Sequence, residues 1–359
     1  MKILQVCAYA APYEGNFMKS IYALENAVRS YGYEFIYAFP ESAQDREWCK
    51  DLAKRSKVYF LPLDKARIRL LTYQKLKRVF IDNPDITIVH SHFELYDLPL
   101  SIVCPKKVKL FWHLHDPLTV GKRIKNSRDL LALVQYKYCS RRAILISVAK
   151  KYKNDIVNIG FREKNAFVVE NGIDLDRIKL QQNDRSKEYT FLSYVWDFYR
   201  KGGDILLKAC DRLITNGYDC KVLLIGNQDA ITYIEKNYPN RVSDFIVQGA
   251  DSDVNNYLSK SHIFVSSSRK ETFSYAVCEA AYAGLPVISS DIYGLEWAYE
   301  VPSVFFFESE NVDSLYNTMV NCLNNQQLDD NVSKTVISEK YSTSAWCKRI
   351  IEIYGINQT

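Results

Sequence analysis

Residues 262–291 read HIFVSSSRKETFSYAVCEAAYAGLPVISSD, and their pattern predicts four consecutive elements. The short apolar run 263–265 is typical of a buried strand, and a polar loop follows it. Ser274 is a favourable N-cap for a helix that runs to residue 283, where Gly284 and Pro286 end it. A second strand starts at residue 287. The stretch therefore predicts a strand–loop–helix–strand unit of a parallel α/β sheet.

The loop of this unit has the features of a ligand site. Open α/β sheets bind ligands in the loops beyond the carboxyl ends of their strands. Glu271 lies in this loop, and Glu279 lies eight residues later in the helix. The N–H groups that begin the helix would suit a phosphate or pyrophosphate. We therefore expect a ligand that carries phosphate.

The same residues resemble the donor-site signature of glycosyltransferase family 4. The resemblance consists of a glutamate, seven residues, a second glutamate, an alanine-rich helix and Gly-x-Pro-Val-Ile. It implies the GT-B fold, in which two Rossmann-like domains face each other across a cleft and a C-terminal helix crosses back to the N-terminal domain. It also implies retaining sugar transfer without a metal or other cofactor. The family usually has Glu-Gly-Phe-Gly where this chain has Glu271-Thr272-Phe273-Ser274, so we expect a narrower donor pocket.

By this resemblance, Glu271 would hold the hydroxyls of the donor sugar and Glu279 the ribose hydroxyls of the nucleotide. Arg200 and Lys201 precede a predicted helix and would clamp the pyrophosphate, although Arg-Lys-Gly is also an ordinary exposed loop. Gly15, in the first loop, would face the donor phosphates, although a helix-entry glycine is an equal alternative. The expected donor-binding residues are Gly15, Arg200, Lys201, Gly249, Glu271, Thr272, Phe273, Ser274, Tyr275 and Glu279, and the expected catalytic residues are His115, Glu271 and Lys201.

Size and composition indicate a two-domain soluble enzyme. The chain has 359 residues, 47% hydrophobic and 25% charged, and no apolar run approaches a membrane span. Residues 1–180 are predicted as the first domain, joined by helix 342–359, and residues 187–341 as the second, with a polar linker at 184–189. Nine scattered cysteines without Cys-x-x-Cys spacing favour reduced thiols and a cytoplasmic location.

The charge is divided unevenly between the two halves. Residues 1–175 hold 29 Lys and Arg against 18 Asp and Glu, a net charge of +11, whereas the rest of the chain carries −6. Within the basic half, segment 65–78 mixes basic residues with Ile68, Leu70, Leu71 and Leu76. Two interpretations stay open for this segment. It is either a solvated helix whose apolar stripe faces the core, or a surface that docks on the anionic inner face of a membrane.

Four of the five histidines lie at two predicted strand ends, as His90-Ser-His92 and His113-Leu-His115. They do not form a known metal-binding motif, so no metal is expected. The resemblance singles out His115, in the sequence His-Asp, as the histidine that would face the donor sugar. The first strand has no Gly-x-Gly-x-x-Gly after it, which argues against a dinucleotide site.

These observations predict a retaining glycosyltransferase. It would move a sugar from a UDP- or GDP-linked donor to a glycan or a lipid-linked acceptor, in bacterial surface polysaccharide or glycoconjugate synthesis. Nucleic acid is not an expected partner. Two alternatives stay open: another GT-B enzyme such as a nucleotide-sugar epimerase, and a non-catalytic partner protein with the same fold. The two glutamates also suggest a glycosidase pair, but both belong to one loop–helix unit beside cations.

Overall fold

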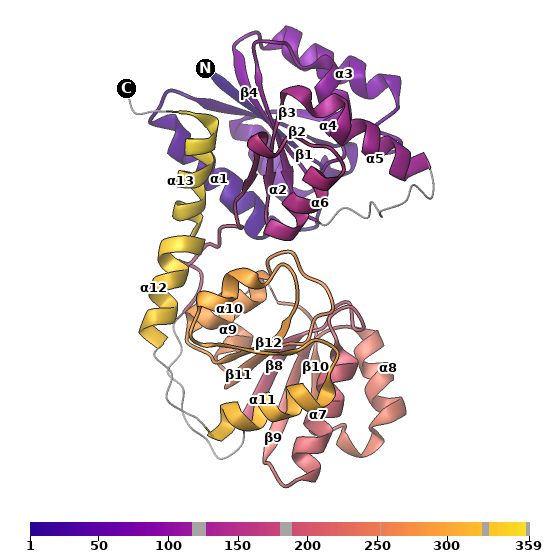
Figure 1. Cartoon of the computed structure of the whole chain (residues 1–359), viewed down its shortest axis with the longest axis vertical. Helices are drawn as coiled ribbons and strands as arrows, with labels where there is room; N and C mark the ends of the chain where they lie inside the picture. Colours follow the sequence, from indigo (N-terminus) through magenta and orange to yellow (C-terminus); the bar gives the residue numbers. More distant parts are fainter. Residues whose placement is uncertain (117–126, 180–188, 252, 325–329, 357–359) are drawn as a thin grey trace. The chain divides into compact units, whose positions relative to one another are not determined.

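The computed structural model describes residues 1–116, 127–179, 189–251, 253–324 and 330–356 (Figure 1). The chain divides into two compact units. Unit 1 comprises Met1–Gly172 and Trp346–Thr359, and unit 2 comprises Ile173–Ala345. The linker predicted at 184–189 falls almost entirely outside the described residues. Among the described residues, no helix combines the length and the apolarity that crossing a bilayer requires.

Unit 1 is built on a seven-stranded parallel sheet with the order β3-β2-β1-β4-β5-β6-β7. Its strands are β1 (Lys2–Cys7), β2 (Glu34–Pro40), β3 (Lys57–Leu61), β4 (Ile86–His92), β5 (Lys109–Leu114), β6 (Ala143–Ser147) and β7 (Ala166–Val168). Its helices are α1 (Gly15–Arg29), α2 (Glu47–Arg55), α3 (Leu70–Asp82), α4 (Asp97–Val103), α5 (Ser127–Lys137), α6 (Lys150–Asn158) and most of α13 (Thr343–Tyr354), with 3₁₀ turns η1 (Glu41–Ala43), η2 (Cys139–Arg142) and η3 (Glu163–Asn165).

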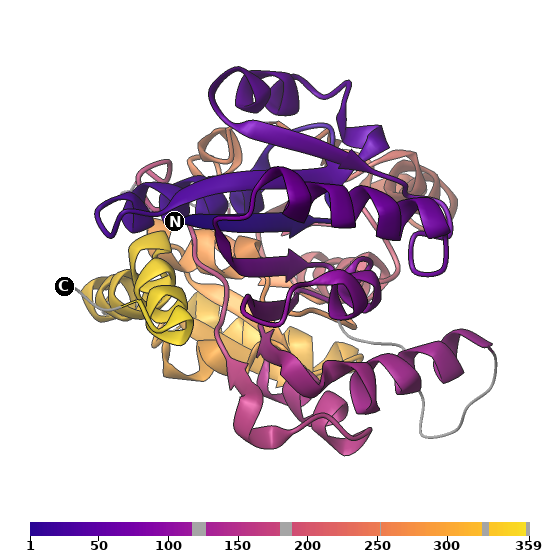
Figure 2. The same cartoon turned by 90° about the horizontal axis from the view of Figure 1, so that it is seen from above.

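Two separate hydrophobic clusters cover the faces of this sheet. Helices α3 to α6 contribute to one cluster, and α1, α2 and α13 contribute to the other. Figure 2 shows α13 in yellow beside the indigo elements of its face. Trp346, Ile350 and Tyr354 bring the end of the chain into the unit 1 core, each 2% exposed or less. The strands are near-continuous apolar runs, as expected for a parallel sheet that is buried on both faces.

Unit 2 has a six-stranded parallel sheet with the order β10-β9-β8-β11-β12-β13. Its strands are β8 (Tyr189–Tyr194), β9 (Cys220–Ile225), β10 (Phe245–Gln248), β11 (Ile263–Ser266), β12 (Val287–Asp291) and β13 (Val304–Glu308). Its helices are α7 (Gly203–Thr215), α8 (Gln228–Asn237), α9 (Asn255–Leu258), α10 (Tyr275–Ala283), α11 (Val312–Asn324) and α12 (Asp330–Tyr341), with 3₁₀ turns η4 (Pro239–Arg241) and η5 (Glu296–Glu300).

The strand–loop–helix–strand unit predicted for residues 262–291 is confirmed as β11, α10 and β12. β11 and β12 pair in parallel, and α10 connects them. Gly284 ends α10 in the left-handed conformation with φ +97°, and the N–H of Leu285 bonds to the carbonyl of Ala280. Ser274 occupies the N-cap position but has φ +61°, and its side chain makes no capping hydrogen bond to the residues that the structure describes.

Each sheet has a point at which the strand order reverses. In unit 1 the chain moves outward from β1 through β2 to β3, then returns to the other side of β1 with β4. In unit 2 the same reversal separates β8 from β11. Parallel sheets bind ligands in the crevice outside the carboxyl ends of the strands at such a point. The loops that follow β1, β4, β8 and β11 are therefore where a site is expected.

Candidate active site

The reversal point of unit 2 carries a largely buried ion pair. Lys201 follows β8 and Glu271 follows β11, and the Lys201 Nζ lies 2.5 Å from the Glu271 Oε1. The side chains are only 11% and 9% exposed. The hydroxyl of Ser268 donates a second hydrogen bond, 2.8 Å long, to the same carboxylate oxygen. Because burying two charges is expensive, such a pair is weak evidence for stability and better evidence for a specific chemical task.

The two loops are held together by a direct backbone contact at Gly202. This residue has φ +67°, and a Cβ atom there would lie 1.9 Å from the carbonyl oxygen of Ser267. The Ser267 hydroxyl also donates to the carbonyl of Gly202 over 2.8 Å. Gly294 approaches the other side of the site, where a Cβ would lie 2.4 Å from the Glu271 carbonyl oxygen. Two glycines therefore allow three loops to converge on Glu271.

The second predicted carboxylate, Glu279, lies on α10 and is 3% exposed. It forms an ion pair with Arg177. Burial and the charge of Glu279 both raise the pKa of the neighbouring Tyr194 well above its ordinary value. Arg177 could not be found from the sequence, because it precedes Glu279 by 102 residues and no motif spacing points to it. The structure thus supplies each glutamate with a cation of its own.

Arg200 is held differently from the adjacent Lys201. Its Nε donates to the Asp197 carboxylate over 2.7 Å and its Nη1 donates to the Lys270 carbonyl over 3.2 Å. The guanidinium lies 4.6 Å from the centre of the Trp196 ring. The structure therefore brings Lys201 to Glu271 and keeps Arg200 in a neighbouring, more exposed salt bridge.

The remaining donor-site residues have distinct roles in the fold. The Phe273 ring is 1% exposed and stacks on Trp297 with 4.8 Å between centres, so its side chain belongs to the core and only its backbone could meet a ligand. Thr272 and Tyr275 flank the turn at Ser274, whose left-handed backbone occupies the position where the resemblance expects a glycine. Gly249, just after β10, accepts a 2.6 Å hydrogen bond from the hydroxyl of Tyr257 through its carbonyl.

The reversal point of unit 1 carries the four histidines. His90 and His92 end β4, and His113 and His115 lie at the end of β5. The rings bond in pairs: His92 Nδ1 lies 3.0 Å from His115 Nε2, and His90 Nε2 lies 3.2 Å from His113 Nδ1. His115 is 8% exposed and also hydrogen-bonds Asn171. Gly15 begins α1 beside this region with φ +58°.

Burial keeps these imidazoles neutral. It lowers the pKa of His115 to about 3 and lowers the pKa values of His90, His92 and His113 well below the ordinary value of a histidine. Nitrogen atoms of these last three rings lie within 4.8 Å of one another, a spacing at which a metal ion could be considered. The His90 and His113 rings are parallel, with 1° between their planes, and a hydrogen bond already joins their facing nitrogens. The absence of a metal from this cluster stays a prediction.

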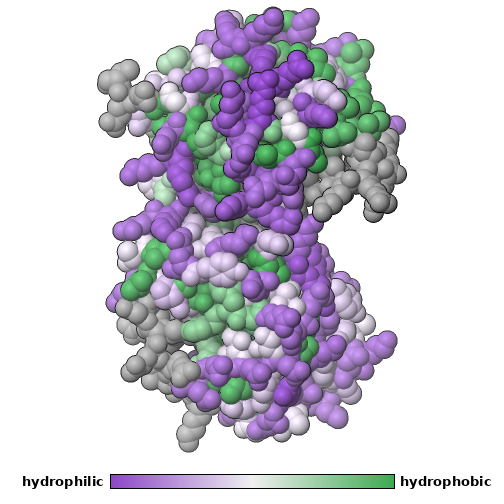
Figure 3. Space-filling model, viewed as in Figure 1, coloured by the Kyte–Doolittle hydropathy of each residue, from purple (hydrophilic) through white to green (hydrophobic). Residues whose placement is uncertain are grey.

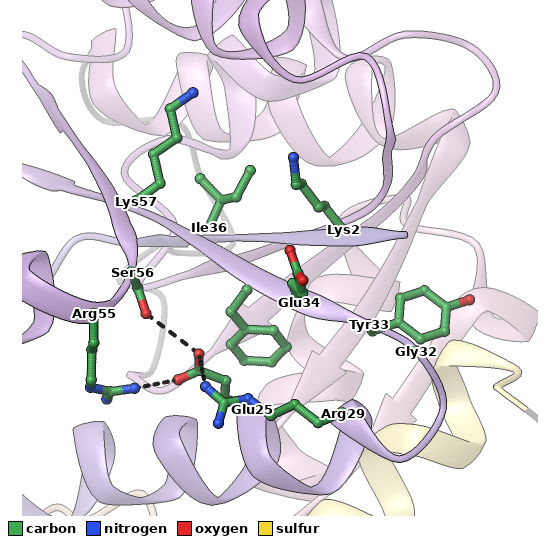
Figure 4. Close-up of a pocket in the computed structure, with 11 residues that line it drawn as sticks. Lys2, Glu25, Arg29, Gly32, Tyr33, Glu34, Ile36, Arg55, Ser56 and Lys57 are labelled. Atoms are coloured by element: carbon green, nitrogen blue, oxygen red, sulfur yellow. Dashed lines mark hydrogen bonds and ion pairs between the residues drawn. The ribbon is translucent and has the colours of Figure 1, made fainter.

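A separate cavity of about 560 Å³ opens at the amino ends of β1, β2 and β3, at the opposite edge of the unit 1 sheet (Figure 4). The buried carboxylate that lines it is already paired. Buried Glu25 accepts from Arg55 over 2.9 Å, from Arg29 over 3.1 Å and from the Tyr37 hydroxyl over 2.8 Å. Because this edge lies away from the carboxyl ends of the strands, we exclude the cavity from the candidate site.

The basic segment 65–78 is only partly helical, since α3 begins at Leu70. Leu76, Val79 and Phe80 of α3 are buried in the unit 1 core, so the stripe of this helix packs inward. Ile68 and Leu70 are instead 67% and 70% exposed. Figure 3 shows hydrophobic and hydrophilic side chains interleaved over this side of unit 1. The inward-facing apolar stripe of the first interpretation is therefore observed in α3, whereas docking on a membrane stays a prediction.

Two sequence families match the chain. Residues 19–177 match the family described as Glycosyltransferase Family 4, and residues 175–338 match the family described as Glycosyl transferases group 1. The chain belongs to the family 4 glycosyltransferases. A human relative of this family 4 chain, 23% identical over 303 residues, is a subunit of phosphatidylinositol N-acetylglucosaminyltransferase. That match covers 82% of the chain but only 62% of the human protein's length.

Solved structures establish the fold of this family 4 member as GT-B. A glycosyltransferase from Rickettsia africae superposes with a TM-score of 0.80 at 16% identity, covering 99% of this chain and 98% of the other. HepE of Anabaena in complex with UDP superposes with a TM-score of 0.79 at 15% identity, covering 99% of this chain and all of the other. The predicted fold class, two Rossmann-like α/β units of the GT-B type, is confirmed.

Proposed function

We propose that this protein transfers a sugar from a nucleoside-diphosphate donor to a glycan or lipid-linked acceptor, with retention at the sugar carbon and without a metal ion. The observation that carries the proposal is the buried Lys201–Glu271 pair at the reversal point of the unit 2 sheet. A cation and a carboxylate in contact, beside the N-terminus of α10, suit a ligand that is both a diphosphate and a polyol.

The proposed roles follow from the charge of each group. As the bond from the sugar to the diphosphate breaks, negative charge develops on the leaving oxygen. The Lys201 ammonium and the N–H groups that begin α10 would stabilise that charge. Glu271 would release part of its contact with Lys201 and accept hydrogen bonds from the sugar hydroxyls. Glu279, fixed by Arg177, would accept the ribose hydroxyls.

His115 is proposed to contact the donor sugar, as the resemblance of the His115-Asp116 sequence implies. The ring is neutral in the folded protein, because burial lowers the pKa of His115 to about 3. It therefore offers a hydrogen-bond contact rather than a positive charge. Gly15, Arg200 and Gly249 are proposed to bind the phosphates and the nucleobase, through their backbone or, for Arg200, through its guanidinium.

The donor and acceptor classes have separate support. The complex of HepE with UDP supports a uridine nucleotide, with a guanosine nucleotide as the other member of the expected class. The name of the human relative supports a lipid-linked acceptor. The role in bacterial surface polysaccharide synthesis stays a prediction. A nucleotide-sugar epimerase would release nucleoside diphosphate independently of any acceptor, whereas a transferase releases it in step with transfer.

The proposal is tested by measuring transfer with a panel of UDP- and GDP-sugars, in the presence and absence of glycan and lipid acceptors. We expect Lys201→Ala and Glu271→Ala each to lower kcat by about 100-fold or more, since removing one preorganised stabilising group costs that much. Lys340→Ala and Glu235→Ala are the matched controls, because both side chains are exposed in the same unit. Activity should persist in EDTA.

Wild-type rates in both site variants would refute the assignment. Binding of UDP and GDP, measured by isothermal titration calorimetry, separates a loss of nucleotide binding from a loss of the chemical step. A variant that keeps its fold and its nucleotide but not its rate supports the proposed chemistry. Failure of the wild-type protein to bind any nucleoside diphosphate would favour the non-catalytic alternative.

We also propose that unit 1 contacts an anionic membrane surface through Ile68, Leu70 and the basic residues around them. Two exposed aliphatic side chains within a basic stretch are the combination that binds lipid headgroups and the adjoining acyl chains. A lipid-linked acceptor would be presented at such a surface. An anionic membrane would thus be the partner that presents the lipid-linked acceptor for the proposed transfer.

A further inference from the structure

We infer that Gln5 and His92 are positioning residues, which fix the proton on the Nε2 of His115 and so set the nitrogen that meets the substrate. The inference rests on the proposed role of His115 in donor binding. Gln5 lies on β1 and His92 on β4, so the two strands that flank the reversal point of unit 1 both take part. The relevant groups are all buried.

A continuous hydrogen-bonded row runs from β1 to β5. The Gln5 Oε1 lies 2.9 Å from the His92 Nε2, and the His92 Nδ1 lies 3.0 Å from the His115 Nε2. A neutral imidazole has one N–H donor and one bare acceptor nitrogen. Gln5 Oε1 can only accept, so His92 must carry its proton on Nε2. Its bare Nδ1 then accepts, and the proton of His115 must be on Nε2.

The orientation of the Gln5 amide is fixed by a second branch. The Gln5 Nε2 donates to the Tyr354 hydroxyl over 3.4 Å, and that hydroxyl lies only 2.6 Å from the His90 Nδ1. A phenolic O–H donating to a bare imidazole nitrogen accounts for so short a bond. A reversed amide would make the tyrosine donate over the long contact instead. The observed distances therefore favour Gln5 with its oxygen toward His92.

This arrangement assigns a chemical character to His115. Because its proton points to His92, the Nδ1 is the bare nitrogen, and a bare nitrogen accepts hydrogen bonds. The ligand group that it suits is a hydroxyl or an amide N–H, such as those that sugars and N-acetyl sugars carry. The ring cannot serve as a proton donor to the leaving group without reversing the protons of both His92 and the Gln5 amide. Asn171 is a further hydrogen-bond partner of His115 in the same unit; burial, the larger effect, keeps the ring neutral although the bond to Asn171 raises the pKa of His115.

The row provides a variant, and the core around it provides a matched control. Gln5→Met keeps the length of the side chain but removes the acceptor for His92. Ile350→Val shortens a buried aliphatic side chain of the same core and leaves the hydrogen bonds of Gln5, His92 and His115 intact. If Gln5→Met acted only by loosening the buried core, Ile350→Val should change the His115 tautomer similarly, since both residues are fully buried.

The tautomer can be measured directly from the ring nitrogens of ¹⁵N-labelled protein by NMR, with His115→Gln used to assign the signals. We expect the wild type to carry the His115 proton on Nε2. Gln5→Met should give a mixture of both tautomers and a fall in kcat of about tenfold with the donor KM little changed. Ile350→Val should leave the His115 tautomer as in the wild type. His92→Phe is a second variant that should match Gln5→Met.

A wild-type His115 protonated on Nδ1 would overturn the inference, and so would an unchanged tautomer in both Gln5→Met and His92→Phe. Stoichiometric zinc in the purified protein, bound to the ring nitrogens, would also overturn it. The tautomer is read without substrate, so its outcome is separate from that of the transfer assay. A protein without transfer activity but with the expected tautomers would contradict the proposed function and support this inference.

Discussion

Gly202 shows how a single residue without a side chain positions a catalytic cation. Its left-handed backbone turns the chain directly after Lys201, and the absence of a Cβ lets it touch the carbonyl of Ser267 in the neighbouring loop. Any other residue would separate the loop after β8 from the loop after β11. Lys201 would then move away from Glu271, so packing and chemistry depend on the same residue.

We therefore predict that Gly202→Ala destabilises unit 2 by at least about 3 kcal/mol, because the methyl group would overlap backbone rather than a flexible side chain. Gly217→Ala is the control: it has a similar φ of +87°, but a Cβ there meets nothing within 4 Å. That substitution should cost only about 1 kcal/mol of backbone strain. Urea denaturation of both variants gives the comparison, and equal losses would contradict the steric argument.

Motifs in the sequence pointed to single residues, whereas contacts that depend only on the fold left no motif. Glu271 and Lys201 were predicted separately and meet in the structure. Arg177 has no such motif, and its contact with Glu279 depends on how two distant segments pack. Gln5 offered a signal that was not used: it is a polar residue inside an otherwise apolar buried strand, and such a residue needs a specific partner.

At the scale of elements, the strand positions were predictable because apolar runs between turn residues mark buried parallel strands. The stretch 262–291 gave the correct β11–α10–β12 order for this reason. The conformation of Ser274 could not be predicted, since serine favours an N-cap yet here adopts a positive φ imposed by the turn. Segment 65–78 was ambiguous because its helix-like mixture of apolar and basic residues begins before the helix itself, which starts at Leu70.

The exposed start of α3 gives the prediction for this scale. The double substitution Ile68→Glu and Leu70→Glu should weaken binding to anionic vesicles at least tenfold, since each buried aliphatic side chain contributes about 1.5 to 3 kcal/mol. Ile81→Glu is the control, because Ile81 is 61% exposed on the same helix but lies outside the basic segment. Vesicle co-sedimentation at low salt is the measurement. No binding of the wild-type protein under these conditions would refute the membrane contact.

At the scale of the whole molecule, the two units differ in how they should respond to acid. The four buried histidines all lie in unit 1. Burial lowers the pKa of His115 to about 3 and lowers the pKa values of the other three, whereas an unfolded chain protonates histidine near pH 6.5. Between these values the unfolded state binds more protons. The stability that neutral histidines contribute is therefore complete above about pH 6.5 and is lost as the pH falls.

One buried group of unit 1 has the opposite sign. Burial raises the pKa of Asp97 to about 7, so the folded state binds the extra proton and this group adds stability as the pH falls from about 7 toward 4. As the pH falls, the stability gained from this one carboxyl group opposes the stability lost from the four imidazoles. We predict that unit 1 loses stability between pH 7.5 and pH 5, at up to about 1.4 kcal/mol per pH unit for each histidine that protonates on unfolding. Asp97→Asn should make the loss steeper.

Hydrogen exchange resolved by peptide can assign this loss to a unit, because a single melting temperature is poorly defined for a chain of two units. Peptides from β4 and β5 should lose protection at pH 5, after correction for the intrinsic exchange rate, and peptides from α13 should follow them. α13 shares the core of unit 1 through Trp346, Ile350 and Tyr354, so acid should release the end of the chain together with the histidine cluster. Constant protection of β4 and β5 between pH 7.5 and pH 5 would show that the imidazoles are not kept neutral by burial. Charged imidazoles carry protons on both ring nitrogens, so His115 would then have no bare nitrogen to offer a ligand.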